Sequence, residues 1–161
     1  MTGDTPEKSR LIDLKLDPES FARATPDVEH ERAVAIYDLL EDKLFHAIGK
    51  PVGGHVLTLS VLQQKLVFDI EIKPTGERLT HILSLTPLRA SIKDYHLICE
   101  SYYDAIRTSA TARIEAIDMA RRGVHNDASE ILRERLSGKI EMDIDTARRL
   151  FTLISALNGL A

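Results

Sequence analysis

Two adjacent arginines and a nearby histidine form the part of the sequence best suited to holding an anion. Arg121 and Arg122 stand directly before Gly123, and His125 follows two residues later. A glycine often ends a helix, and Asp127 is a favourable first residue for the next one. Guanidinium groups beside the unpaired N–H groups of a helix start bind phosphate or carboxylate oxygens well. We therefore expect an anion- or partner-binding site at a helix start near Asp127, formed by these two arginines and His125.

The same two arginines also have a purely structural interpretation, in which they pair with carbonyl groups of their own helix and with acids such as Asp118. A DNA-binding helix-turn-helix with Gly123 in its turn is a third interpretation. From Ala105 to the C-terminus, however, nine basic residues stand against eight acidic ones. Phosphate backbones require an excess of positive charge, so nucleic acid is not expected as a partner.

Three other side chains are candidates for a pocket between sheet and helix. His81 lies in the middle of an apolar strand face, and Tyr95 and Tyr102 lie on the core-facing stripe of a later helix. Such groups supply the few polar contacts that an apolar ligand pocket needs. The alternative is that His81 is an ordinary core histidine. His55, on the same strand face, is expected at the frayed end of the sheet, too far from His81 to share a zinc ion.

The remaining reactive side chains have simpler explanations. Cys99 falls in mid-helix on the apolar side, where a thiol stays neutral, so we expect it to be buried and inert. His96, Glu100 and Asp104 have the spacing of metal ligands, but a solvated charged face explains them equally well. No catalytic residue, metal site or cofactor is therefore expected.

The elements that position these side chains are expected to form one α+β domain over residues 10–161, after a flexible tail at 1–9. Alternating apolar residues predict a strand at 10–17. Thr25-Pro26 has the pattern of a helix start, and the helix is expected to end near Ile48-Gly49.

Three alternating runs, at 55–61, 66–72 and 79–85, predict an antiparallel meander. We expect Leu62 to pair with Lys65 across the first turn and Lys73 to pair with Arg78 across the second, which keeps all apolar runs on one face. The prediction is a four-stranded, mainly antiparallel sheet with a strand-helix-three-strand order, covered on one face by a C-terminal group of helices. The later elements are expected to be helices at 87–107 and 111–122, a helix from 126 or 127 to 137, a short strand at 140–142, and a last helix that begins near Asp143 or Asp145 and includes Leu157.

Composition limits the class of protein. The chain has 161 residues, a net charge of −4 and one cysteine, with 43% hydrophobic and 29% charged residues. These values are typical of a globular domain and exclude an intrachain disulfide. No apolar run approaches the roughly 20 residues of a membrane helix, and the first ten residues have no apolar core. We expect a cytoplasmic protein without a membrane partner.

Three stretches of the chain, at 24–41, 93–107 and 114–154, resemble an uncharacterised family of small bacterial proteins. The resemblance implies a bacterial cytosolic protein and brings no activity, cofactor or catalytic residue with it. The favoured function is therefore a non-catalytic protein-interaction or regulatory role, with a protein partner or self-association through the helix at 87–107 or the C-terminal helix. The alternative is a small-molecule-binding protein or small enzyme that uses His81, Tyr95 and Tyr102.

Overall fold

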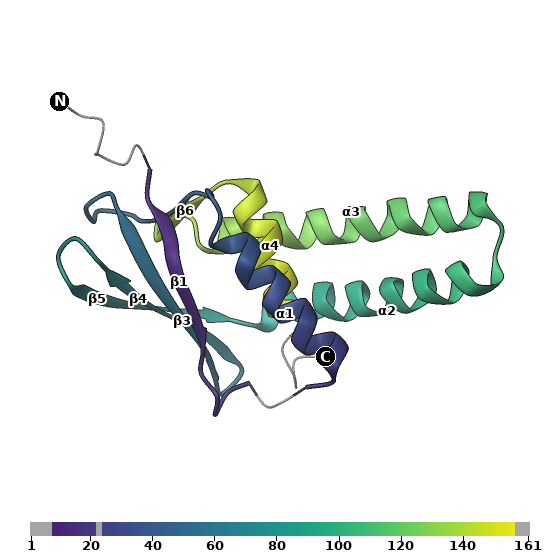
Figure 1. The fold of residues 1–161 in the computed structure, drawn as a ribbon, viewed down its shortest axis with the longest axis horizontal. Helices are drawn as coiled ribbons and strands as arrows, with labels where there is room; N and C mark the ends of the chain where they lie inside the picture. The colour runs from purple at the N-terminus through teal and green to yellow at the C-terminus, as the bar shows by residue number, and fades with distance from the viewer. Residues whose placement is uncertain (1–7, 22–23, 157–161) are drawn as a thin grey trace.

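A computed structural model describes residues 8–21 and 24–156 of the protein. The helices lie on one side of a four-stranded sheet, and two of them form a long hairpin that projects away from it (Figure 1). The α+β class is therefore confirmed. Residues 1–7 of the predicted tail lie outside the described residues, whereas Ser9 is buried.

The sheet is mixed rather than mainly antiparallel, which corrects the expectation from the sequence. Its strands are β1 (Arg10–Leu16), β3 (Gly54–Leu62), β4 (Lys65–Ile72) and β5 (Glu77–Ser84), in the order β1-β3-β4-β5. β1 runs parallel to β3, whereas β3, β4 and β5 are antiparallel. The chain between β1 and β3 contains α1 (Pro26–Leu39), and parallel strands need such a crossover. Alternation of side chains defines the faces of β1 but not the direction of its neighbour.

The two hairpins differ in how well their registers were predicted. Leu62 pairs with Lys65 as expected, across a two-residue turn in which both glutamines have positive φ. In the second hairpin, Ile72 pairs with Glu77, so the predicted pairing of Lys73 with Arg78 is wrong. The second register differs from the expected one by two residues. An even shift keeps side-chain parity, and the apolar residues therefore still share one face.

The structure also contains a two-stranded ribbon, of which the sequence predicted only one strand. The first helix ends at Leu39, and the segment predicted to continue it contains β2 (Phe45–Ala47) instead. β2 pairs antiparallel with β6 (Ile140–Met142), the short strand that was expected. A three-residue strand whose partner lies almost a hundred residues away leaves no periodic signal of its own. The predicted start of α1 is confirmed, because the Thr25 hydroxyl accepts a hydrogen bond from the Val28 N–H at 3.3 Å.

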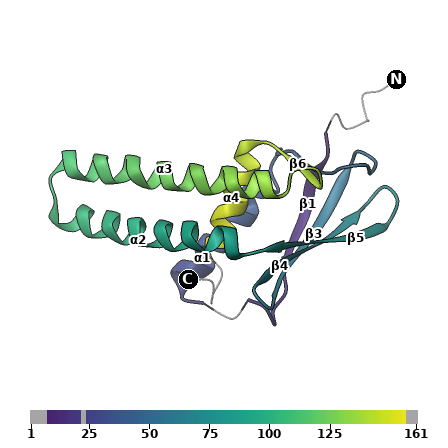
Figure 2. The same cartoon turned by 180° about the vertical axis from the view of Figure 1, so that it is seen from behind.

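The projecting hairpin consists of α2 (Thr86–Thr108) and α3 (Thr111–Arg135), seen from behind in Figure 2. α3 is continuous, so the two predicted helices at 111–122 and 127–137 are one, and Gly123 makes no turn. A methyl group added at Gly123 would meet nothing within 4 Å, and glycine costs a helix only about 1 kcal/mol. The flanking helix-forming residues and the packing of α3 on α2 and α4 outweigh that cost.

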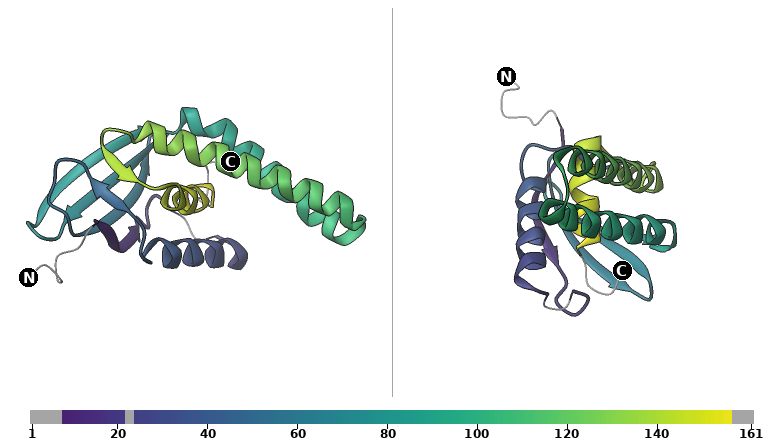
Figure 3. Two further views of the ribbon diagram at one scale, coloured as in Figure 1. Left: turned by 90° about the horizontal axis from the view of Figure 1, so that it is seen from above. Right: turned by 90° about the vertical axis from the view of Figure 1, so that its right-hand side faces the viewer.

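The last helix, α4 (Ile144–Ser155), lies between α1 and α3 (Figure 3). It begins at Asp143, whose carboxylate accepts a hydrogen bond from the Thr146 N–H at 2.9 Å. Most of its residues are buried, because it packs on both neighbouring helices and on the core under the sheet. α4 is thereby held against α3 along a face that carries the polar residues described next.

Candidate anion-binding site

A hollow of about 260 Å³ lies where α2, α3 and α4 meet. It brings together Tyr95 and the three residues predicted to bind an anion. The complete lining is Tyr95 from α2, Arg121, Arg122 and His125 from α3, and Arg148, Arg149 and Thr152 from α4. Four of these seven residues are thus predicted from the sequence, and the three from α4 are not.

The two long walls of the hollow are built on the same spacing. On α3 two arginines are followed, four residues after the first, by His125, and on α4 two arginines are followed in the same way by Thr152. Residues four apart lie on one face of a helix. The repeated spacing at Arg148-Arg149 is therefore a signal that could have identified the second wall.

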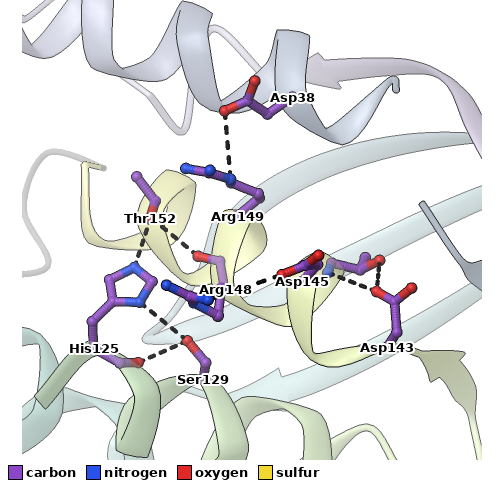
Figure 4. Close-up of polar contacts among 9 residues, drawn as sticks. Asp38, His125, Ser129, Asp143, Asp145, Arg148, Arg149 and Thr152 are labelled. Atoms are coloured by element: carbon purple, nitrogen blue, oxygen red, sulfur yellow. Dashed lines mark hydrogen bonds and ion pairs between the residues drawn. The ribbon is translucent and has the colours of Figure 1, made fainter. Parts of the chain in front are cut away.

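His125 and Thr152 join the two walls. The Thr152 hydroxyl donates to the Arg148 carbonyl oxygen at 3.0 Å, so it can only accept from His125, whose Nε2 lies 2.7 Å away (Figure 4). This pattern assigns the ring proton to Nε2. Nδ1 lies 3.5 Å from the Ser129 hydroxyl, which donates instead to the His125 carbonyl oxygen at 2.7 Å.

The surroundings of His125 favour its neutral form. Its ring packs edge-to-face against Tyr95 and Phe151, with centroids 5.2 and 5.3 Å away. Burial lowers the pKa of His125 to about 4, helped by the positive charges of Arg148, Arg149 and Arg121. The histidine is therefore an uncharged part of a positively charged site at neutral pH.

Each arginine of the hollow also has an acidic partner. Asp118 bridges Arg121 and Arg122, at 2.6 and 3.1 Å, which is the pairing that the structural interpretation of these arginines predicted. Arg148 lies 3.9 Å from Asp145, and Arg149 lies 3.4 Å from Asp38 of α1. Four guanidinium groups thus share three carboxylates, which leaves one positive charge in excess.

The four guanidinium groups differ in how freely they can move. The side chain of Arg121 is only 26% exposed and lies over the Tyr102 ring, 4.1 Å from its centroid. Those of Arg122, Arg148 and Arg149 are 71%, 44% and 51% exposed. The Arg121 guanidinium is therefore held in place, whereas the other three guanidinium groups can turn towards a ligand.

One part of the predicted mechanism is wrong. Because α3 continues through Gly123, no helix begins near Asp127. The backbone N–H groups around Asp127 are bonded within α3 and are not available to an anion. An anion in the hollow would be held by guanidinium groups, with no contribution from a helix start.

The other predicted pocket residues are not gathered in one place. His81 of β5 lies opposite Phe68, whereas the predicted pairing of Lys73 with Arg78 would have set it opposite Ile70, and it does not line the hollow. Tyr102 is half-buried under Arg121. Only Tyr95 reaches the hollow, which is formed by helices and not by the sheet and a helix.

Cys99 and Tyr95 border a neighbouring hollow of about 230 Å³. Cys99 is half-buried rather than buried, and burial raises the pKa of its thiol. Burial also raises the pKa of the Tyr95 hydroxyl, and the adjacent Cys99 thiol adds to the shift. Both groups are neutral at physiological pH. Within 8–21 and 24–156, no three histidine, cysteine, aspartate or glutamate side chains are placed to hold a metal ion.

His55 is not at a frayed end of the sheet, which corrects a further expectation. It is completely buried, and its Nε2 accepts a hydrogen bond from the Ala47 N–H at 3.1 Å. The β2–β6 ribbon covers this end of the sheet, and the His46 ring lies 5.8 Å from that of His55. The burial of His55 was not predicted because the three-residue strand β2 leaves no periodic signal in the sequence.

The fold and the hollow define an α+β protein with an arginine-lined site between three helices. The chain belongs to the uncharacterised protein family UPF0262, whose family model matches residues 8–159. UPF0262 proteins of Brucella canis and Mesorhizobium japonicum are each 56% identical to it over 159 residues, which is 98% of each chain. One of Rhizobium meliloti is 60% identical over 148 residues, 92% of this chain and 93% of the relative.

These relatives confirm the family that the sequence resembled. No solved structure matches the chain. In the part of the chain that the structure describes, no helix is both long and apolar enough to cross a membrane.

Proposed function

We propose that this protein is a non-catalytic binding protein of the bacterial cytoplasm, and that its hollow holds a carboxylate or phosphate group on the surface of a partner protein. The observation that carries this proposal is the placement of four guanidinium groups, two from α3 and two from α4, around one hollow. Planar guanidinium groups bind such oxygens in pairs of parallel hydrogen bonds.

The size and openness of the hollow favour a group carried by a larger partner. Pockets that enclose whole small molecules usually measure about 300–1,000 Å³. This one, at about 260 Å³, is smaller, and three of its guanidinium groups reach into solvent. An acidic side chain can enter it while the rest of the partner lies over the exposed faces of α3 and α4.

The protonation states around the hollow favour binding over catalysis. The thiol of Cys99 and the hydroxyl of Tyr95 have raised pKa values, so neither is an anionic nucleophile. The buried Ser129 hydroxyl donates to a backbone carbonyl and not to His125 Nδ1. The groups that remain available to a ligand are therefore the cationic ones.

Isothermal titration calorimetry at low ionic strength tests this proposal with three probes: inorganic phosphate, citrate and a hexaglutamate peptide. The test variant is Arg122→Gln combined with Arg148→Gln, because both side chains are exposed and each forms its ion pair, among the described residues, with an acid of its own helix. The matched control is Arg107→Gln, whose side chain is 73% exposed and makes the same kind of ion pair outside the hollow.

We expect the peptide to bind the wild-type protein and the double variant to bind it at least about tenfold more weakly, since a hydrogen bond to a charged group contributes about 1.5–3 kcal/mol. The Arg107→Gln variant should match the wild type. Equal binding by the double variant would refute the site. If phosphate or citrate binds more tightly than the peptide, the hypothesis that a partner protein carries the ligand group is refuted, and the ligand is a free small anion.

A further inference from the structure

The two edges of the four-stranded sheet are built differently. The β1 edge carries Arg10, Asp13 and Lys15, and its register shifts between Leu11 and Asp13. Charged residues and register irregularities are the usual devices that keep an edge strand from pairing with another chain. The β1 edge is thus protected against association.

The β5 edge is less protected, because its charged residues, Glu77 and Arg78, both stand at its first end. From Leu79 to Ser84 it contains no charged residue and no proline, and it pairs with β4 without any shift in register. Ile82 is 54% exposed on the outer face. Among the described residues β4 is its only strand neighbour, so the N–H and C=O groups on its other side have no strand partner. Such an edge is a template for a further strand.

The helices cover only one end of β5. On the inner face Leu83, near the start of α2, is buried, whereas Leu79 and His81 are half-exposed. In Figure 2 the first part of β5 extends beyond the helices, and its last residues reach the base of α2. The strand therefore has one covered end and one uncovered end.

We propose that β5 pairs antiparallel with β5 of a second copy of this chain, about a two-fold axis perpendicular to the sheet. Antiparallel pairing sets the uncovered end of each strand beside the covered end of the other. The helix base of each copy then flanks Leu79 and His81 of its partner, which an unrelated strand would not provide. The result is one continuous eight-stranded sheet with its helices on one side.

The sequence of β5 is compatible with this symmetry. Outer residues lie opposite outer residues only if one residue pairs with its own copy across the axis, and the two residues at the middle of β5 are Thr80 and His81. Whichever of these two pairs with its copy, Glu77 and Arg78 lie opposite uncharged residues of the second copy. No like charges meet along the new strand pair.

Sedimentation velocity of the full chain, from low-micromolar to high-micromolar concentration, tests the proposal. The test variant is Ile82→Lys, which places a charge on the exposed edge. The control is Ser60→Lys, which places the same charge on the outer face of β3, two strands from that edge. We expect the wild type and the control to dimerise and Ile82→Lys to raise the dissociation constant at least tenfold. Circular dichroism of all three checks that the fold is retained.

Hydrogen exchange locates the contact independently of any variant. If β5 pairs with its copy, the amides of β5 that point away from β4 should exchange more slowly as the wild-type concentration rises. A wild type that stays monomeric at the highest concentration would overturn the proposal. So would a dimer in which those amides exchange at the same rate as in the monomer. Neither result bears on the arginine hollow, because its residues lie outside β5.

Discussion

Acid should destabilise this protein through His125. The pKa of His125 is lowered from 6.5 to about 4 in the folded protein, whereas in the unfolded chain it returns to its ordinary value. Between these two values the unfolded chain binds a proton that the folded protein does not. The contribution of His125 to stability is therefore complete above pH 6.5 and is lost as the pH falls towards about 4. A difference of about 2.5 pKa units corresponds to about 3 kcal/mol.

The test compares the wild type with His125→Gln, whose side-chain amide can still donate to Thr152. Urea denaturation near neutral pH and at about pH 4 gives the loss of unfolding free energy for each protein. Other titrating groups, including His55, His81 and Asp143, contribute equally to both proteins and cancel in the difference. We expect the wild type to lose about 3 kcal/mol more than the variant. An equal loss, or an NMR titration placing the His125 pKa near 6.5, would refute this account of its environment.

Three further predictions concern the helices. Gly123→Ala should raise the free energy of unfolding by about 0.5–1 kcal/mol, because the methyl group meets nothing within 4 Å and alanine favours the helix; a loss of stability would argue against a continuous α3. Phe151→Ala should cost about 3–5 kcal/mol in urea denaturation because its ring is fully buried, whereas Tyr37→Ala, at a side chain 68% exposed, should change stability by about 0.5 kcal/mol at most. Cys99 should react slowly with a thiol reagent at neutral pH, since burial raises its pKa; labelling at the rate of the unfolded chain would contradict this.

Local periodicity was a sound guide to the strands of the meander and to their faces. Leu57, Phe68 and Leu83 are all buried on one side of the sheet, as alternation predicted, even though the second register differs by two residues. An even shift leaves the faces unchanged, and this part of the prediction therefore tolerates an error in turn length. The direction of β1 and the β2–β6 ribbon depend on contacts between segments that are distant in the sequence. A local pattern of apolar residues does not predict such contacts.

The candidate site was predicted in part, and for a reason that proved wrong. The prediction of Arg121, Arg122 and His125 depends on Gly123 ending a helix, yet these residues share one face of a continuous helix. Their grouping depends on helical spacing, which places them together whether or not a turn follows. Arg148 and Arg149 were missed because they were considered only as part of the last helix, and only the packing of α4 on α3 brings them to the same hollow.

Proton binding and anion binding should be coupled if the hollow works as proposed. Burial lowers the pKa of His125 most, and three arginines lower it further; the same guanidinium groups would bind the anion. An anion there offsets their charge and so raises the pKa of His125, while Tyr95, on the remaining side, stays neutral. By linkage, whatever raises that pKa binds more tightly when the histidine is protonated. The affinity for hexaglutamate should therefore rise as the pH falls below neutral, and His125→Gln should reduce that rise. A pH dependence unchanged in the variant would show that the proton binds elsewhere, for instance on the peptide itself.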